Sequence, residues 1–149
     1  MSLNVSDPAI ADLYEDVRED KSETNWAFFD FAAGKPDRLK VSGSGTGGFE
    51  EFLAHLKSDV AGWGYVRLNL SNDEYSLRVK FILVPWCGES VGVMRRAKLG
   101  IQIADVKSIL RSYHIEVPAS QLSELDEKDI MTKLRKANGA NYDRQLSNY

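Results

Sequence analysis

Three kinds of residue in this sequence could do chemistry: one cysteine, two histidines and a run of glycines. Cys87 could act as a nucleophile only beside a base, and its spacing to His55 and His114 indicates no such pairing. One cysteine and two scattered histidines also form no recognisable zinc motif. We therefore predict an inert core thiol at Cys87, no catalytic residue, no metal site and a protein that is not an enzyme.

The glycine run Gly43-Ser44-Gly45-Thr46-Gly47-Gly48 satisfies the G-x-G-x-x-G pattern of dinucleotide-binding turns. That fingerprint needs a parallel strand–helix–strand unit, whereas the strand before this run looks like the second arm of a hairpin. A phosphate-binding loop would need Lys after the last glycine, but Phe49 and Glu50 follow, and Glu50 and Glu51 would repel phosphate. The segment predicts a flexible surface loop and no cofactor, with a nucleotide-dependent enzyme as a rival.

The basic residues are unevenly distributed along the chain. Residues 76–111 carry seven Lys and Arg against two acidic residues, whereas residues 1–75 carry seven against fourteen. Such a block could attract an acidic partner, although solvated helix faces would give the same pattern. The sequence pI of 5.4 disfavours nucleic acid as that partner.

Several basic side chains fall on predicted helices or strands that could bring them together. Lys133 and Lys136, three residues apart, share a face of the last predicted helix, where Asp129 is within reach of Lys133. Lys80, on a predicted strand, would join Lys136 in one patch if this helix crosses the sheet near that strand. A second group, near the end of a helix predicted over residues 91–99, comprises Arg95, Arg96 and Lys98.

The elements that position these side chains form one domain. The chain has 149 residues, of which 43% are apolar and 10% aromatic, enough for a single buried core. The longest strongly apolar stretch, residues 81–87, is too short to span a membrane, and the N-terminus has no secretory pattern. We predict a domain over residues 1–140, a flexible tail over residues 141–149 and a cytoplasmic location.

Hydrophobic periodicity and turn signals give the order of the elements. A helix starts at Ser6-Asp7-Pro8, and two hairpins place Trp26, Trp63 and Trp86 on strands, where we expect them to pack. This order predicts an α+β, three-layer α/β/α domain with a mixed, mainly antiparallel sheet flanked by helices. The later elements are strands over 25–31, 38–41, 63–70, 79–86 and 114–117, a turn at 72–74, helices over 49–56, 91–99 and 103–113 with Gly100 between the last two, and a helix from Asp126 to a stop at Asn138-Gly139.

Three segments form longer motifs: RVKFILVPWCGE at 78–89, RAK at 96–98 and MTKLRKANGANY at 131–142. With Asn25-Trp26 and the Gly47-Gly48-Phe49 loop, they resemble the coactosin family of small actin-filament-binding proteins. These proteins are built on the actin-depolymerising-factor (ADF) homology domain. The resemblance covers almost the whole chain and implies that fold, a mixed central sheet between helices.

The resemblance also implies a function and a site. It implies a non-enzymatic monomer that binds actin filaments, has little affinity for actin monomers and regulates the actin cytoskeleton. The family's key actin-contacting lysines fall on Lys80 and Lys136. In the wider family the long helix after the central strand contacts actin, and residues 91–98 are its counterpart. The flanking residues of the predicted site are Arg78, Met94, Arg95, Arg96, Lys98 and Lys133.

The sequence departs from the family in two places. Coactosins commonly read SKRSKF where residues 76–81 read SLRVKF, so one cation is lost. Val93 stands where cofilin-type helices carry Lys beside Met94, which disfavours monomer binding and severing. Ser2 lacks basic neighbours, so no phosphorylation switch is predicted there. The alternative hypothesis is that the same fold binds a protein other than actin.

Overall fold

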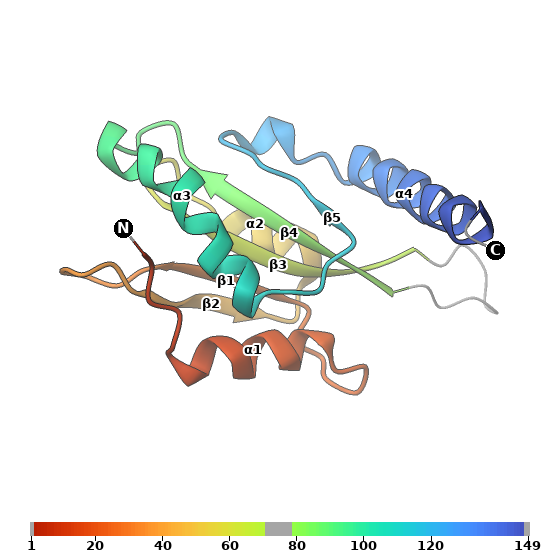
Figure 1. The fold of residues 1–149 in the computed structure, drawn as a ribbon, viewed down its shortest axis with the longest axis horizontal. Coiled ribbons are helices and arrows are strands. Elements are labelled where there is room, and N and C mark those ends of the chain that lie inside the picture. The colour runs from red at the N-terminus through yellow and green to blue at the C-terminus, as the bar shows by residue number, and fades with distance from the viewer. Residues whose placement is uncertain (1, 71–78, 148–149) are drawn as a thin grey trace.

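A computed structural model describes residues 2–70 and 79–147 of this chain, with side chains described as far as Ala137 (Figure 1). The five strands form one sheet in the order β2-β1-β3-β4-β5, antiparallel except for the parallel β4–β5 pair. The predicted mixed, mainly antiparallel sheet is thus confirmed. The elements are α1 (Pro8–Arg18), β1 (Trp26–Phe31), β2 (Leu39–Gly45), α2 (Gly48–His55), β3 (Ala61–Asn69), β4 (Val79–Cys87), α3 (Val93–Ile109), β5 (Ile115–Glu116), the short 3-10 helix η1 (Leu122–Glu124) and α4 (Glu127–Ser147).

Helices cover both faces of the sheet, which gives the three predicted layers. In Figure 1, α3 crosses in front of the strands, α1 runs below them next to β2, and α2 lies behind them. Side chains alternate between the faces along each strand. On β4, Phe81 and Leu83 join the core under α1 and α3, whereas Ile82, Val84 and Trp86 join the core under α2 and α4. We call these the α1/α3 core and the α2/α4 core.

The first helix follows its sequence signals. The Asp7 carboxylate accepts a hydrogen bond from the Ala9 amide at 3.0 Å, and Pro8 occupies the first helical position. The predicted apolar stripe faces the sheet, where Ile10, Tyr14 and Val17 are buried.

The helix after β4 differs from the prediction. Gly100 was expected to separate two helices, but α3 runs without interruption from Val93 to Ile109. A glycine inside a helix costs about 1 kcal/mol relative to alanine, which weakens a helix without ending it. The buried Gln102, Val106 and Leu110 hold the second half of α3 against the sheet, so tertiary packing outweighs that cost.

Two other boundaries differ as well. The predicted flexible glycine loop is partly strand, because β2 continues through Gly43 to Gly45 in pairing with β1. The predicted stop at Asn138-Gly139 is wrong, because the helical backbone of α4 continues to Ser147. The tail was predicted over residues 141–149, whose side chains are not among those described. The turn predicted at 72–74 lies outside the described residues altogether.

No helix in the described ranges is both long enough and apolar enough to cross a membrane.

Candidate functional site

Lys80 lies at the start of β4, opposite Leu68 of β3. By the alternation along β4, Lys80 projects to the same face as Ile82 and Val84, which is the face of the α2/α4 core. Its side chain is half-buried. The strand therefore aims this lysine toward the side of the sheet that α4 covers.

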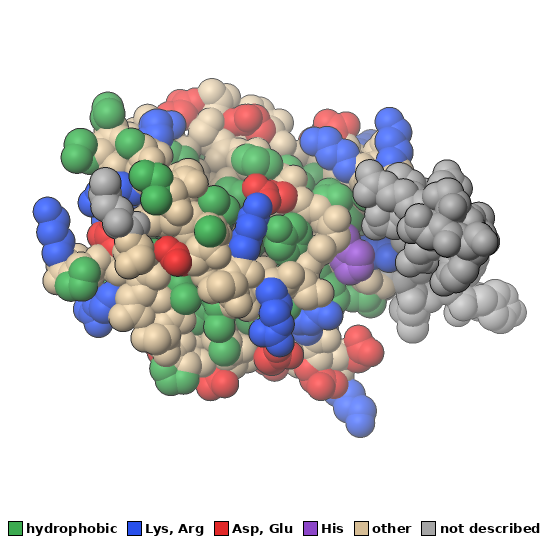
Figure 2. Space-filling model, viewed as in Figure 1, with side chains coloured by type: hydrophobic (Ala, Val, Ile, Leu, Met, Phe, Trp, Pro, Cys, Tyr) green, Lys and Arg blue, Asp and Glu red, His purple; other side chains and the backbone are tan. Residues whose placement is uncertain are grey.

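The last helix presents two further lysines on that side. The Asp126 carboxylate caps α4 by accepting from the Lys128 amide at 2.8 Å, and Ile130 and Leu134 bury its inner face. Because Lys133 and Lys136 are offset from this buried stripe, both are exposed. Figure 2 shows Lys and Arg side chains gathered over the first turns of α4.

The structure thus brings three predicted site residues to one side of the sheet. We call Lys80, Lys133 and Lys136 the lysine face. The expected pairing of Lys133 with Asp129 is absent: within the ranges that the structure describes, no ion pair joins Lys133 or Lys136 to a carboxylate. Arg78, the neighbouring predicted contact, lies outside the described residues.

A histidine that sequence reasoning did not place in the site lies close to Lys80. The Phe81 amide donates to His114 Nδ1 at 2.9 Å, and the His114 amide donates to the Phe81 carbonyl at 2.8 Å. Partial burial lowers the pKa of His114, and the positive charges of Lys80 and Arg18 act in the same direction. Because His114 Nδ1 accepts the hydrogen bond from the Phe81 amide, it carries no proton, and the ring fixes the backbone beside Lys80.

The predicted residues of α3 lie on the other face of the sheet. Arg95 Nη1 is 3.0 Å and Lys98 Nζ is 3.8 Å from Asp37 Oδ2, in the connection between β1 and β2. The Arg95 guanidinium also lies 3.8 Å from the centroid of the Phe31 ring. These two cations are thus engaged in holding α3 to the β1–β2 hairpin.

Of the two remaining candidates at the start of α3, Arg96 is engaged in hydrogen bonds and Met94 is exposed. Arg96 Nη2 donates to carbonyl oxygens of the preceding loop, including that of Gly88 at 3.2 Å. Met94, in contrast, is 75% exposed and its neighbour Val93 80% exposed. Hydrophobic side chains are visible over this end of α3 in Figure 2. The predicted residues therefore form two surfaces, the lysine face and the exposed start of α3.

Asp37 is the central residue that sequence reasoning missed. Hydrogen bonds from Gln102 and Arg95 lower the pKa of its carboxyl group, with Gln102 contributing most. Burial opposes this shift without reversing it. The only local signal was an acidic residue in a turn after Pro36, which carries no information on a partner 58 residues away.

The glycine run does not form a phosphate site. Glu51 Oε1 accepts from the Trp26 indole at 2.8 Å and from the Gly47 amide at 3.2 Å, so a carboxylate occupies the amide that a phosphate would need. The Trp26 hydrogen bond is the main cause of a lowered pKa of Glu51. A side chain at Gly43 would meet His55, at 2.6 Å from its ring. Close packing explains these glycines.

His55 and Cys87, the other residues that could do chemistry, do not form a site with each other. His55 Nε2 lies 2.9 Å from the Ser42 hydroxyl, and burial lowers the pKa of His55. Cys87 is half-buried at the end of β4, more accessible than the enclosed thiol we predicted. Over the described residues, no group of three His, Cys, Asp or Glu side chains could hold a metal ion. The three tryptophans are buried, as predicted.

Comparison with known proteins identifies the family of this chain. Residues 2–135 match the family described as cofilin/tropomyosin-type actin-binding protein. Coactosin from Dictyostelium discoideum is 34% identical over 140 residues, which cover 93% of this chain and 94% of that protein.

Solved structures agree with this placement. The crystal structure of coactosin from Entamoeba histolytica has a TM-score of 0.83 and 34% identity, covering 92% of this chain and 97% of that one. The solution structure of mouse coactosin, described as an actin filament binding protein, has a TM-score of 0.75 and 32% identity over 97% of this chain and 99% of that one. The resemblance seen in the sequence is thus confirmed, and this chain belongs to the cofilin/tropomyosin-type actin-binding proteins as a coactosin-like member with the ADF-homology fold.

Proposed function

We propose that this protein binds actin filaments and regulates their dynamics, with the lysine face as its main contact. The observation that carries the site is that Lys80, Lys133 and Lys136 come from two distant segments and lie on one side of the sheet. The actin-filament binding stated for mouse coactosin, whose similarity spans nearly both chains, supports the partner. The protein acts by binding, as a monomer in the cytoplasm and on the cytoskeleton.

Ammonium groups on an exposed helix suit an acidic partner surface. Lys133 and Lys136 lack a carboxylate partner within the part of the chain that the structure describes, so binding an acidic surface breaks no internal ion pair at these positions. Contacts of this kind steer association and weaken as salt screens them. Binding should therefore be tighter at low than at physiological ionic strength.

The start of α3 provides a smaller, apolar contribution. Met94 and Val93 offer exposed surface, but the neighbouring cations Arg95 and Lys98 are already paired with Asp37. An apolar patch without unpaired flanking charge gives little electrostatic attraction to an acidic partner. We infer that filaments are bound in preference to actin monomers, and that severing is weak.

Co-sedimentation with actin filaments at low and physiological salt tests this proposal. The double variant Lys80→Ala/Lys136→Ala should remain in the supernatant where the wild type pellets. A matched variant, Lys21→Ala/Lys57→Ala, removes the same charge from exposed positions outside the lysine face and should pellet like the wild type. Failure of the wild type to pellet at low salt would contradict filament binding. Equal pelleting of all three proteins would place the contact elsewhere.

A further inference from the structure

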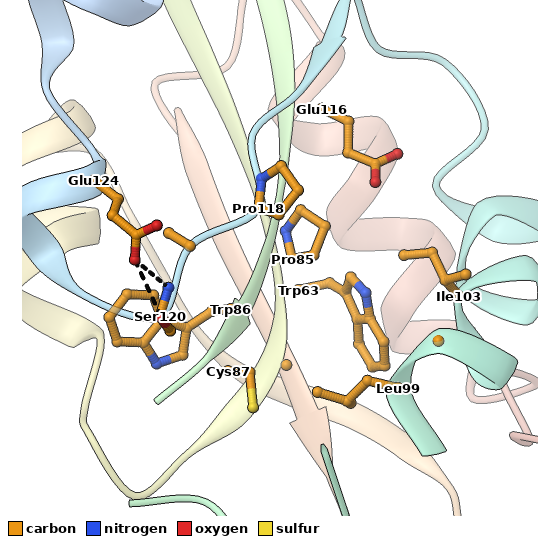
Figure 3. A pocket seen from close by; sticks show the side chains of 13 residues that line it. Trp63, Pro85, Trp86, Cys87, Leu99, Ile103, Glu116, Pro118, Ser120 and Glu124 are labelled. Carbon is orange, nitrogen blue, oxygen red and sulfur yellow. Dashed lines mark hydrogen bonds between the residues drawn. The ribbon is translucent and has the colours of Figure 1, made fainter. Parts of the chain in front are cut away.

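A cavity of about 410 Å³ opens between α3 and the segment that runs from β5 to η1. Its floor is the end of β4 and the adjoining part of β3. Figure 3 shows Trp63 beside Leu99 and Ile103 of α3, with the rings of Pro85 and Pro118 facing them. Trp63, Leu99 and Ile103 belong to the α1/α3 core, so the cavity opens on that side of the sheet, although Trp86 and Ala119, which also line it, belong to the α2/α4 core.

Apolar surface continues from the cavity onto its surroundings. Ile101 on α3 is 57% exposed and directly follows Gly100, which lines the cavity. Leu122 on η1 is 51% exposed and lies between two lining residues in the sequence, Ser120 and Glu124. Exposed aliphatic side chains around an apolar cavity are typical of a site that binds another protein. A small molecule held inside the cavity would leave both of these side chains in water.

The charges at the cavity are negative. Glu116 and Glu124 line it, and no Lys or Arg does so among the described residues. Glu116 is paired with Lys107 at 2.7 Å. Glu124 has no cationic partner in the described ranges and accepts hydrogen bonds from the Ser120 and Gln121 amides, both at 3.0 Å. These amide hydrogen bonds lower the pKa of Glu124, mainly that from Ser120, so its charge persists at neutral pH.

We propose that this cavity is a docking site for a segment of a partner protein that carries a bulky apolar side chain next to Lys or Arg. The apolar side chain fills the space between Trp63 and Pro118, and the basic side chain pairs with Glu124. Ile101 and Leu122 pack against the rest of the segment. None of the residues that line the cavity belongs to the lysine face.

Gly100 provides the variant that closes the cavity. Gly100 lines it, and a Cβ built there has no heavy atom within 4 Å, so a side chain can start from this position without a clash at its Cβ. Ala104, one turn further along α3, is exposed and does not line the cavity. Gly100→Phe and Ala104→Phe therefore form a matched pair that adds the same ring to the same helix.

Selection of random nine-residue peptides displayed on phage, with the full chain immobilised, provides the probe. We expect enriched peptides to carry a bulky apolar residue within two positions of Lys or Arg. A synthesised peptide from this set should bind about tenfold more weakly to Gly100→Phe, since anchor residues dominate such interfaces. It should bind about two- to fivefold more weakly to Glu124→Gln, the effect of an exposed ion pair. Ala104→Phe and Lys80→Ala/Lys136→Ala should bind like the wild type.

The single cysteine gives an independent readout. Because Cys87 lines the cavity and is the only cysteine of the chain, alkylation by iodoacetamide reports on this site alone. A saturating peptide should slow that reaction. The absence of enriched peptides, enriched peptides without a basic residue, or equal binding to Gly100→Phe would overturn the proposal. Protection of Cys87 by phenethylamine without any peptide enrichment would also overturn it, because the cavity would then bind small amines.

Discussion

Arg95 on α3 donates a hydrogen bond to Asp37 in the connection between β1 and β2, with 3.0 Å between Nη1 and Oδ2. Gln102, about two turns further along the same helix, donates to the same oxygen at 2.9 Å. Asp37 therefore joins the hairpin to both halves of α3. Since its side chain is only 10% exposed, this contact contributes more than an ion pair at the surface.

Removing the charge of Asp37 should destabilise the fold. In Asp37→Asn the acceptor of two hydrogen bonds becomes neutral, and hydrogen bonds to charged groups contribute about 1.5–3 kcal/mol each before solvent screening. Because Arg95 is partly exposed, we expect a loss of about 1–2 kcal/mol in the free energy of unfolding, measured by urea denaturation. Asp12→Asn, at an exposed position of α1, should change stability by less than about 0.5 kcal/mol. Equal stability of the two variants would contradict the role of Asp37.

The stabilisation by Asp37 should depend on pH in a defined direction. Its pKa is lowered in the folded state, so the unfolded chain binds the proton more readily. The difference in stability between the wild type and Asp37→Asn should be complete above the unfolded pKa of about 3.9 and should shrink as pH falls through the folded pKa. Urea titrations between pH 7 and pH 2.5 measure this difference. The other carboxyl groups with lowered pKa are present in both proteins, so a difference that stays constant with pH would contradict the assignment.

Two glycines should respond in opposite directions to the same substitution. Gly100→Ala should raise the stability by about 0.5–1 kcal/mol, because alanine favours the helix and its methyl group meets no neighbour. Gly62→Ala should lower it by about 1–3 kcal/mol, because a Cβ there would lie against the Phe29 carbonyl and 2.7 Å from the Phe28 ring. Thermal unfolding of both variants checks the pair. A destabilised Gly100→Ala would show that α3 needs glycine at this position.

The order of the elements could be predicted from the sequence because the signals are local. Asp7 with Pro8 marks the start of α1, and Asp126 caps α4. The boundaries that were predicted wrongly depend on distant contacts. Gly100 weakens a helix that the buried Val106 and Leu110 hold in place. The glycines of β2 were expected in a loop, yet they pair with β1 and pack against side chains of α2.

The candidate site shows the same limit. The resemblance and the residue types selected Lys80, Lys133 and Lys136, but only strand pairing and helix docking place them on one side of the sheet. Whether a cation is available to a partner could not be predicted, because Asp37 lies 58 residues from Arg95 in the sequence. The docking cavity likewise needs β3, β4 and α3 to meet.

Replacing Arg95 by alanine should mainly reduce stability, whereas replacing Lys136 by alanine should mainly reduce the affinity for filaments. Arg95→Ala leaves the more distant Lys98 as the only ion-pair partner of Asp37 in the described ranges, and it removes the contact with the Phe31 ring. We therefore expect a loss of about 1–2 kcal/mol in stability and a small loss of filament binding. Lys136→Ala removes an exposed side chain that forms no ion pair within the described part of the chain, so stability should change by less than about 0.5 kcal/mol. Its affinity for filaments should fall, and the remaining affinity should depend less on salt.

Urea denaturation and co-sedimentation of the two variants, each corrected for the fraction folded, separate these effects. Lys35→Ala, at an exposed position of the β1–β2 connection, controls for the loss of one positive charge and should resemble the wild type in both measurements. If Arg95→Ala loses more filament affinity than Lys136→Ala, the start of α3 is the main contact. The lysine face would then be secondary, and the role proposed for Lys136 would be contradicted.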